Sequence, residues 1–489
     1  MKKKKVILII LCLAIFTGCS NVKKIENYPF SDGKSTSSDE GSNSNKDGDT
    51  LDYVVLNSSG TTAFEVKATK VEDKDETYPV YDVDPCKFSD DDLKKYCEKL
   101  FDKGSTNVIL PIFLTQSDYV EKRIKDLTER KDAIETKEEE VPPYIDEELK
   151  VLNERSISEN LGSNYTIPYN NEIGWINLND FYENEMNEEI DCHFCYVEGT
   201  IDGEYYRADF LDNMNNTAIS IYRQNAYSGE PDSYLTLKDT EHLPYDKNSC
   251  TLTEQDATNK SEEFLEKLGI NGYEPIAVYP VCIYGEQKDY SGNYLADAQS
   301  GYTCYFAREV NGKTRPYNSF VDESTFIKPY ANYLLSLSQY HEFGMYSHLE
   351  IGENSGVFRL GYEYLRVSIT DRGIEECFFN SPSNVGDIKT DKAELLSFDK
   401  IDKRAQEYLQ YYTNNIDDET HYSIPKIDLV QMGMCRVTDD DKHYYMVPAW
   451  YYYLSSDLLQ VEKKSAVCIN AIDGSIIDVE SGGNTIEID

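Results

Sequence analysis

The chain has 489 residues, of which 40% are hydrophobic and 28% are charged. It contains 48 Lys and Arg residues against 89 Asp and Glu residues, which gives a formal net charge of −41 at pH 7. A charge of this size repels phosphate backbones and anionic lipid headgroups, so the composition excludes nucleic-acid binding and membrane adhesion through basic patches. The length predicts roughly two to four domains with ordinary cores.

The N-terminus, MKKKKVILIILCLAIFTGCS, has the organisation of an export signal. After the lysines, the apolar stretch Val6–Phe16 is too short, at about 1.5 Å per helical residue, to cross a ~30 Å hydrocarbon core. The closing Thr-Gly-Cys resembles the lipobox of bacterial lipoproteins, with Phe16 where that motif usually has Leu. This resemblance implies a lipoprotein signal peptide over residues 1–18 and lipid on Cys19. The chain would then be anchored to the outer face of the cytoplasmic membrane of a Gram-positive bacterium.

Residues 19–50 are expected to form a flexible tether. Ser31–Thr50 consists almost entirely of Ser, Gly, Asn, Asp and Lys, so it cannot bury enough surface to offset its ordering entropy. A tether of about 30 residues places the folded part roughly 30 Å from the membrane. Asn43–Val54 resembles a calcium-binding loop, but its twelfth position, which needs a bidentate carboxylate, is Val54. The sequence therefore predicts neither a metal nor a cofactor.

The twelve cysteines do not form a metal or redox pattern. The single close pair, Cys192 and Cys195, lies in an alternating segment that predicts a hairpin turning near Asp202 and Gly203. Residues three apart in a strand point to opposite faces, and a redox pair would need a helix N-terminus. Zinc would need a second pair at comparable spacing. We therefore expect isolated or disulfide-paired strand cysteines.

No catalytic group of residues stands out in the sequence. His341–His348 begins like a zinc-protease motif, but its second histidine comes about 10.5 Å further along a helix, too far to share one ion. Ala307–Thr314 lacks the first glycine of a phosphate-binding loop, and Asn311-Gly312 predicts a hairpin turn instead. A non-enzymatic protein is therefore expected, although the many carboxylates leave an unrecognised hydrolase open.

Region 51–250 mixes predicted helices and strands. Ser89 is expected to be the N-cap of a helix with acidic residues in its first turn, and Gly104 is expected to end it. An amphipathic helix is predicted from Ser117, and the segment after Trp175 is mostly strand-like.

Segments 251–392 and 393–489 share one plan, in which a helix is followed by antiparallel strands. Thr253 and Ser397 are the expected N-caps of the two helices. Each helix has a predicted apolar stripe: Ala257, Phe264, Leu265 and Leu268 in the first, and Phe398, Ile401, Ala405, Tyr408, Leu409 and Tyr412 in the second. Burying such a stripe on one face of a sheet gives an α+β fold, here with several domains.

The densest aromatic run, HYYMVPAWYYYL, is predicted to be a strand near the C-terminus. Trp450 and Tyr452 should face the core of the sheet and helix, whereas Tyr451 and Tyr453 should face outward as candidates for contact. Pro448 cannot donate a hydrogen bond to a strand ladder, so it predicts an edge strand or a strand beginning.

The helix-plus-strand plan, the VPAW strand Val447–Trp450 and the closing hairpin Ile469–Ile477 resemble PepSY-type repeats. They are similar to the extracytoplasmic regulators YycH and YycI and to uncharacterised Gram-positive surface lipoproteins, best over 393–489 and more weakly over 251–392. The resemblance implies no catalytic residues, and implies a protein that binds or restrains a partner such as a sensor kinase or peptidase. YycH and YycI are held by a transmembrane helix, whereas a lipid anchor is predicted here.

The sequence thus predicts a non-enzymatic, membrane-anchored extracytoplasmic lipoprotein that binds or regulates a protein partner at the cell surface. The expected partner is a membrane protein or a secreted peptidase. A glycan- or peptide-binding module is the alternative, because the 40 tyrosines carry rings that suit sugar stacking and protein interfaces alike. The presence of only two tryptophans weakens the sugar version.

Overall fold

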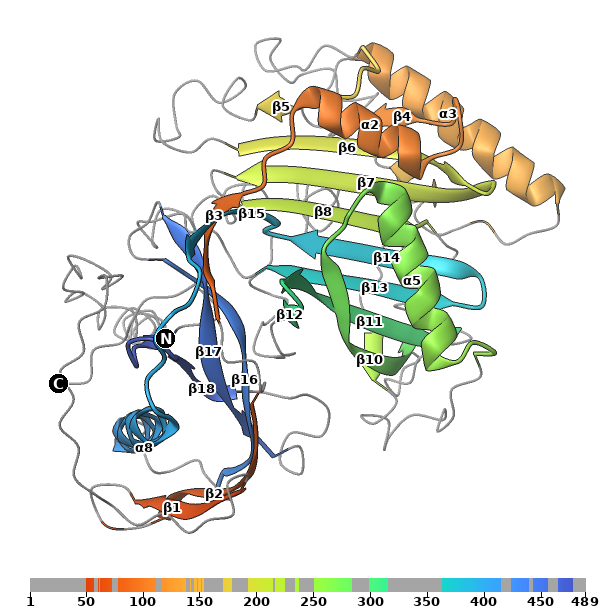
Figure 1. Ribbon diagram of the computed structural model, residues 1–489. Helices are drawn as coiled ribbons and strands as arrows, with labels where there is room; N and C mark the ends of the chain where they lie inside the picture. The colour runs from red at the N-terminus through yellow and green to blue at the C-terminus, as the bar shows by residue number, and fades with distance from the viewer. Residues whose placement is uncertain are drawn as a thin grey trace, which may run out of the picture.

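A computed structural model describes residues 50–56, 60, 62–72, 78–110, 117–137, 141, 145–146, 148–150, 152–153, 170–177, 192–213, 216–224, 234–236, 250–283, 299–314, 363–414, 424–438, 443–455 and 465–477. The predicted signal peptide, Cys19 and nearly all of the predicted tether lie outside these residues. The described part has a mixed α+β fold with two sheets (Figure 1). Within it, no helix combines the length and the apolar character needed to cross a membrane.

The first sheet, called sheet A, has eight strands in the order β1-β2-β16-β17-β18-β19, with β3 pairing to β17 and β15 pairing to β3. Its strands are β1 (Thr50–Leu56), β2 (Thr62–Val71), β3 (Val80–Pro85), β15 (Ser383–Thr390), β16 (Lys426–Thr438), β17 (Tyr444–Leu454), β18 (Ser465–Asn470) and β19 (Ile476–Ile477). Helix α8 (Phe398–Asn414) packs on one face and buries Ile401, Ala405 and Leu409 there. This confirms the stripe predicted for the second helix at these three positions.

The second sheet, called sheet B, has eleven strands in the order β4-β6-β7-β8-β14-β13-β11-β10-β9, with β5 on β6 and β12 on β11. Its strands are β4 (Asn107–Ile109), β5 (Ile176–Asn177), β6 (Cys192–Ile201), β7 (Glu204–Asn213), β8 (Asn216–Arg223), β9 (Tyr234–Thr236), β10 (Tyr273–Ile283), β11 (Gln299–Val310), β12 (Lys313–Thr314), β13 (Tyr364–Thr370) and β14 (Gly373–Asn380). Helices α2 (Asp90–Leu100) and α5 (Glu254–Leu268) cover one face. Helix α3 (Ser117–Thr136) contacts the other face near β6.

Strand pairing links the three predicted regions of the chain. Strand β8 pairs with β14, which joins region 51–250 to region 251–392 within one sheet. Strand β2 pairs in parallel with β16, so the start of region 51–250 belongs with the strands of region 393–489 (Figure 1). The chain therefore begins sheet A, builds sheet B and returns to sheet A. Local periodicity does not encode such long-range pairing.

The local start signals are confirmed for α2 and α5. Ser89 and Asp92 form a capping box at α2, and Thr253 and Asp256 form one at α5. Helix α2 ends at Leu100 with Phe101 as its C-cap, so the stop predicted at Gly104 falls in the turn that follows. Helix α8 begins directly after Ser397, whose carbonyl accepts from the amides of the first turn.

The predicted hairpins are also confirmed. Strands β6 and β7 join at Asp202 and Gly203, with φ of 53° and 84°, and β11 and β12 join at Asn311 and Gly312, with φ of 54° and 74°. Paired positive φ values are those of the two-residue turns that match the twist of antiparallel strands. The turn between β13 and β14 uses Gly373, with φ of 112°.

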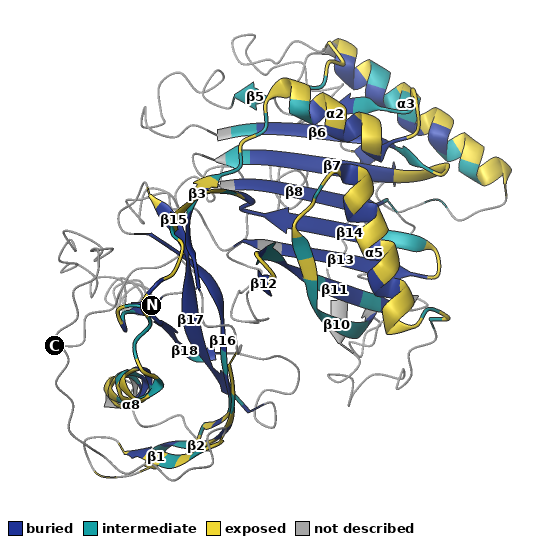
Figure 2. Cartoon of the chain, in the orientation of Figure 1, coloured by how far each residue is buried: buried dark blue, intermediate teal, exposed yellow. Residues whose placement is uncertain are grey.

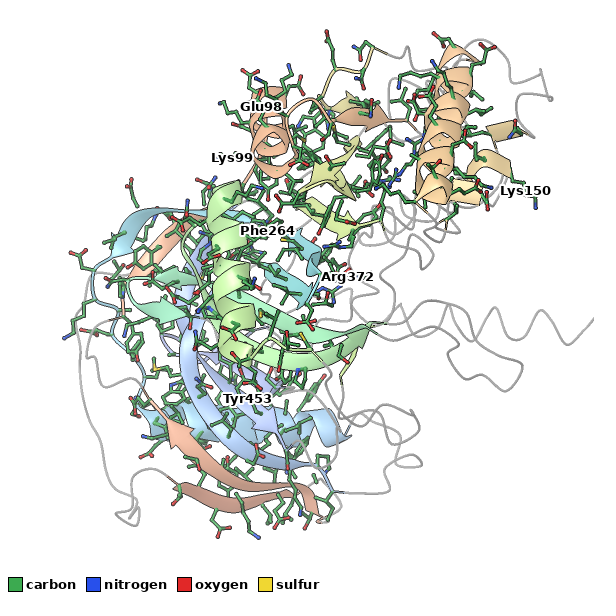
Figure 3. The ribbon with its side chains drawn as sticks, turned by 90° about the vertical axis from the view of Figure 1, so that its right-hand side faces the viewer. Glu98, Lys99, Lys150, Phe264, Arg372 and Tyr453 are labelled. Carbon is green, nitrogen blue, oxygen red and sulfur yellow. The ribbon has the colours of Figure 1, made fainter. Side chains whose placement is uncertain are left out.

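The core of sheet B lies between its strands and helices α2 and α5. Phe264, labelled in Figure 3, packs there with Leu265 and Leu268, as the predicted stripe requires. The strands of sheet B are buried along most of their length, whereas both helices expose their outer sides (Figure 2). Four cysteines share this core: Cys97, Cys195, Cys304 and Cys377.

Candidate functional site

The aromatic strand β17 is a buried strand rather than a contact surface. Trp450 is 2% exposed and packs edge-on against Phe398 of α8, with ring centroids 4.8 Å apart. Tyr451 and Tyr453 point to the other face, as the alternation predicts, but both are buried in a core that includes Phe378 of sheet B. The prediction that these tyrosines face outward is therefore wrong, because the second face of sheet A also packs in a core, which Phe378 of sheet B joins.

Pro448 lies inside a central strand, and the edge position predicted for it is wrong. One edge of β17 pairs along its length with β16, whereas the other pairs with β3 at Tyr444–Met446 and with β18 at Ala449–Tyr453. Pro448 falls in the gap between these two partners, where its carbonyl accepts from the amide of Ala471 at 2.9 Å. The missing N–H of proline therefore removes no ladder bond.

The other chemical candidates do not form a site within the described residues. Burial raises the pKa of Cys195 to about 12, which keeps its thiol protonated and unreactive. His341 and His348 lie outside the described residues. Across the part of the chain that the structure covers, no group of three His, Cys, Asp or Glu side chains could hold a metal ion.

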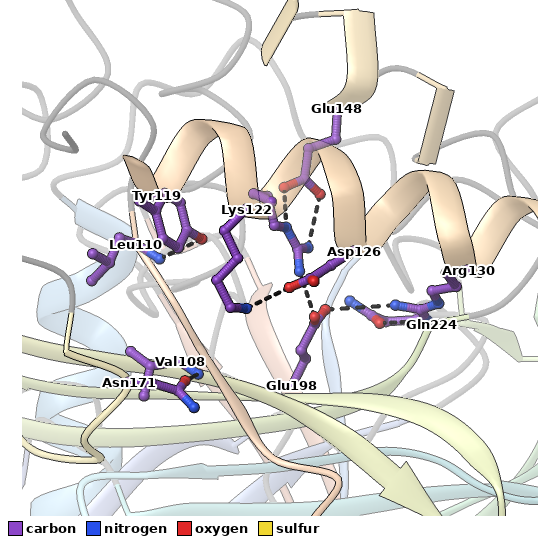
Figure 4. A network of polar contacts seen from close by, with 11 residues as sticks. Val108, Leu110, Tyr119, Lys122, Asp126, Arg130, Glu148, Asn171, Glu198 and Gln224 are labelled. Carbon is purple, nitrogen blue, oxygen red and sulfur yellow. Dashed lines mark hydrogen bonds and ion pairs between the residues drawn. The ribbon is translucent and has the colours of Figure 1, made fainter. Parts of the chain in front are cut away.

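A buried charged network joins α3 to sheet B (Figure 4). Arg123 donates to both carboxylate oxygens of Glu148, at 2.8 and 3.1 Å, and also to Glu198 on β6. Arg130, about two turns further along α3, lies 3.6 Å from Glu198, donates to Gln224 and stacks over the ring of Tyr205. Long polar side chains therefore help to attach α3 to the sheet, together with its buried Tyr119, Val120 and Leu127.

The electrostatics of this network favour its charged state. Burial opposes ionisation of Glu198, but Arg123 and Arg130 outweigh it, and the pKa of the carboxyl lies below its ordinary value. Burial likewise opposes the charge of Arg123, and Glu148 and Glu198 together hold its pKa well above its usual range. The network is therefore a closed set of ion pairs, whose carboxylates are engaged by guanidinium groups.

A second charged cluster joins the two sheets. The buried carboxylate of Glu363 accepts from Arg308 of β11 at 2.9 Å and from the hydroxyl of Tyr273 at 2.6 Å. It also accepts from the backbone amide of Ser383, the first residue of β15, at 3.0 Å. Arg436 of sheet A donates to the carbonyl of Ser381 in the same connection, at 3.1 Å. This cluster fixes the crossing of the chain from sheet B to sheet A.

The open edge of sheet A is the described surface best suited to contact with another molecule. Within the described residues, β1 pairs with β2 alone and ends the strand order of the sheet. Two of its large apolar residues, Val54 and Leu56, are 52% and 43% exposed. The end of α8 lies beside it, where the side chain of Gln410 donates to the carbonyl of Leu56 at 2.9 Å and Tyr411 is 42% exposed.

A second edge strand of sheet A, β15, shows how such an edge is normally protected. It contains Gly386 and Lys389, and its register against β3 shifts twice. Charges, glycines and bulges of this kind hinder the addition of another strand. Strand β1 has a single charged residue, Asp52, no glycine or proline, and one register shift at its end. It is therefore open to strand pairing in a way that β15 is not.

The sequence pattern of β1 shows its two faces but not its position at an edge. The alternation of TLDYVVL is readable, since Tyr53 and Val55 face the core beneath α8 while Asp52 and Val54 face outward. That a strand lies at an edge is a property of the sheet order, which places β16 and not another hairpin beside β2.

Comparisons with known proteins give little further guidance. No protein-family model matches the sequence, and no curated protein matches it. Among solved structures, an uncharacterized protein from Eubacterium rectale is similar at 10% identity, covering 86% of this chain and 91% of that chain, with a TM-score of 0.38. The C-terminal domain of YpeB from Bacillus megaterium is similar at 9% identity, covering 62% and 92%, with a TM-score of 0.18. Both TM-scores are too low to bear on fold or function.

Proposed function

We propose that this protein is an extracytoplasmic lipoprotein, anchored through Cys19, that binds or regulates a protein partner at the cell surface without catalysing a reaction. The observation that carries the proposal is the open edge of sheet A. There β1 exposes Val54 and Leu56 and leaves its outer backbone groups available for pairing. Exposed apolar residues on an unprotected edge strand are a known route to association with another chain.

The charged clusters support a binding role over a hydrolytic one. Glu198 and Glu363 are 6% and 8% exposed and are engaged by arginines. A glycoside hydrolase instead needs two carboxyl groups that face the same substrate bond. In the described residues these carboxylates hold elements together, namely α3 on sheet B and sheet B on sheet A.

We also infer that the two helix-plus-strand units are PepSY-like. The support is the resemblance of their sequence plan and the presence of α5 and α8, each packed on one face of an antiparallel array. PepSY-like units agree with a role in binding rather than in catalysis.

The test uses the full chain and a Cys19→Ser variant in the same bacterial host. The wild-type chain should carry labelled fatty acid, sediment with membranes and retain one partner protein in a fixed ratio after cross-linking. The variant should lose the label and appear in the soluble fraction. A wild-type chain that retains no partner would contradict the proposal, and binding to cell wall stripped of protein would favour a glycan-binding module instead.

A further inference from the structure

We propose that β1 is completed by an extended segment of the partner, which adds a strand to sheet A and carries basic and apolar residues at every second position, on one face of the added strand. This inference rests on the proposed function, because it names the chemistry of the partner that the open edge would take. The occupant is a partner chain and not a second copy, since each copy carries a formal charge of −41 and two copies repel each other.

The backbone of β1 supplies the affinity in this arrangement. In an antiparallel pair, alternate residues direct their N–H and C=O groups to the same side. Strand β1 pairs through Thr50–Leu56 with β2, so its alternate residues direct these groups away from the sheet. An added strand would satisfy them, as in other complexes in which a peptide extends a sheet.

The side chains of β1 indicate what the added strand should carry. Asp52 and Val54 are exposed on the outer face, and Leu56 is exposed at the strand end. Lys67 lies opposite Asp52 on β2, where it pairs with Glu65 at 2.6 Å and is also attracted to Asp52. On the unpaired side of β1, a lysine or arginine opposite the exposed Asp52 and an apolar residue opposite Val54 would complement this face.

The position of β1 in the chain fits the same occupant. It is the first described element after the predicted tether, so it lies within roughly 30 Å of the anchor on average. Four other edge strands are less suitable: β19 has two residues, β4 and β9 have three each, and β15 is protected by charge and register shifts. Within the described residues, strand β10 is unpaired on one side before Val281, but it contains Pro275 and Pro280.

The test measures binding of short labelled peptides to the full chain in detergent by fluorescence anisotropy. The probe has threonine at every second position, and the positions between carry lysine, valine, valine and lysine in that order. The control peptide has glutamate in place of both lysines. We expect the basic probe to bind about tenfold more tightly than the acidic one. Val54→Lys should weaken the basic probe about tenfold, whereas Ile388→Lys, an equally exposed position at 53% on β15, should leave it unchanged.

A charge reversal keeps the proposal testable if Val54→Lys fails to fold. Asp52→Lys should reverse the preference, so that the acidic probe binds more tightly than the basic one. Equal binding by wild type and Val54→Lys, or no binding to wild type, would overturn the inference. The inference would also be overturned if a folded Val54→Lys chain recovered its protein partner as well as wild type does. That result would not contradict the proposed function. A wild-type chain that recovers no partner contradicts the proposed function itself.

Discussion

Arg308 of β11 and Glu363, the residue before β13, form a buried ion pair of 2.9 Å at the junction of the two sheets. Glu363 reaches sheet A as well, since the amide and hydroxyl of Ser383 both donate to it. A single carboxylate thus connects two sheets whose strands come from distant parts of the chain. Breaking such a pair leaves a buried charge without its partner, which costs far more than an exposed pair is worth.

Glu363→Gln is therefore expected to lower the free energy of unfolding by about 3 kcal/mol at neutral pH. Burial opposes ionisation of Glu363, but Arg308 and Arg436 outweigh it and hold its pKa below the ordinary value of 4.5. A lowered pKa contributes stability above pH 4.5 that is lost as the pH falls through the folded pKa. The difference between wild type and variant should therefore narrow on acidification, as measured by denaturant unfolding from pH 7 to pH 3.

The matched control is Glu407→Gln, which removes an exposed ion pair between Arg404 and Glu407 at 3.2 Å on α8. This change should cost less than about 0.5 kcal/mol at every pH. Equal losses for Glu363→Gln and Glu407→Gln would contradict the assigned role of Glu363.

Arg123→Met should detach α3 from sheet B. The change leaves Glu148 and Glu198 buried without their shared guanidinium, a loss of about 3–5 kcal/mol that falls on the attachment of this helix. Hydrogen exchange should then speed up across α3 and stay slow across α5, because α5 packs on the apolar core of sheet B.

Two further variants separate this effect from a general loss of stability. Lys125→Met alters the same helix at a side chain that is 72% exposed, and it should leave exchange unchanged. Adding Glu198→Gln to Arg123→Met should restore part of the protection of α3 against hydrogen exchange, because it removes one of the two buried carboxylates that have lost Arg123. Protection of α3 that survives Arg123→Met would show that the apolar contacts of this helix hold it in place.

The local part of this fold could be predicted from the sequence, because its signals lie within a few residues. Ser89 and Thr253 mark helix starts, and Asn311-Gly312 marks a turn, through their own side chains and backbone freedom. The return of the chain to sheet A is not local. The pairing of β2 with β16 joins residues that lie more than three hundred positions apart, and no periodicity records it.

The candidate site was hidden for the same reason. Alternation along β17 correctly separates Trp450 from Tyr451, but whether the second face meets solvent depends on residues far away in the sequence, such as Phe378, that pack on it. Alternation along β1 separates Val54 from Val55 in the same way, and there the outer face stays exposed. The two strands have similar patterns and opposite surroundings, so a sequence pattern alone could not tell a buried strand from an open one.

The cysteines in the core of sheet B should resist alkylation until the protein unfolds. Cys97 and Cys377 are at most 1% exposed, and burial raises the pKa of both thiols, which suppresses the reactive thiolate. With iodoacetamide at pH 8, both should react at least about tenfold more slowly than the half-buried Cys86, as followed by mass spectrometry. Rapid labelling of Cys97 in the folded chain would mean that α2 opens readily from the sheet.

Trp450→Ala should destabilise the protein by about 3–5 kcal/mol. The indole fills the space between β17 and α8, where it is 2% exposed and meets the ring of Phe398, so its loss leaves a cavity that neither element can close. Tyr411→Ala, on the exposed side of the same helix, should change the free energy of unfolding by less than about 0.5 kcal/mol. Both are read from urea denaturation at neutral pH. If Trp450→Ala kept full stability but no longer bound the protein partner, β17 would be a binding surface. The proposal that the partner binds at the open edge of β1 would then be contradicted.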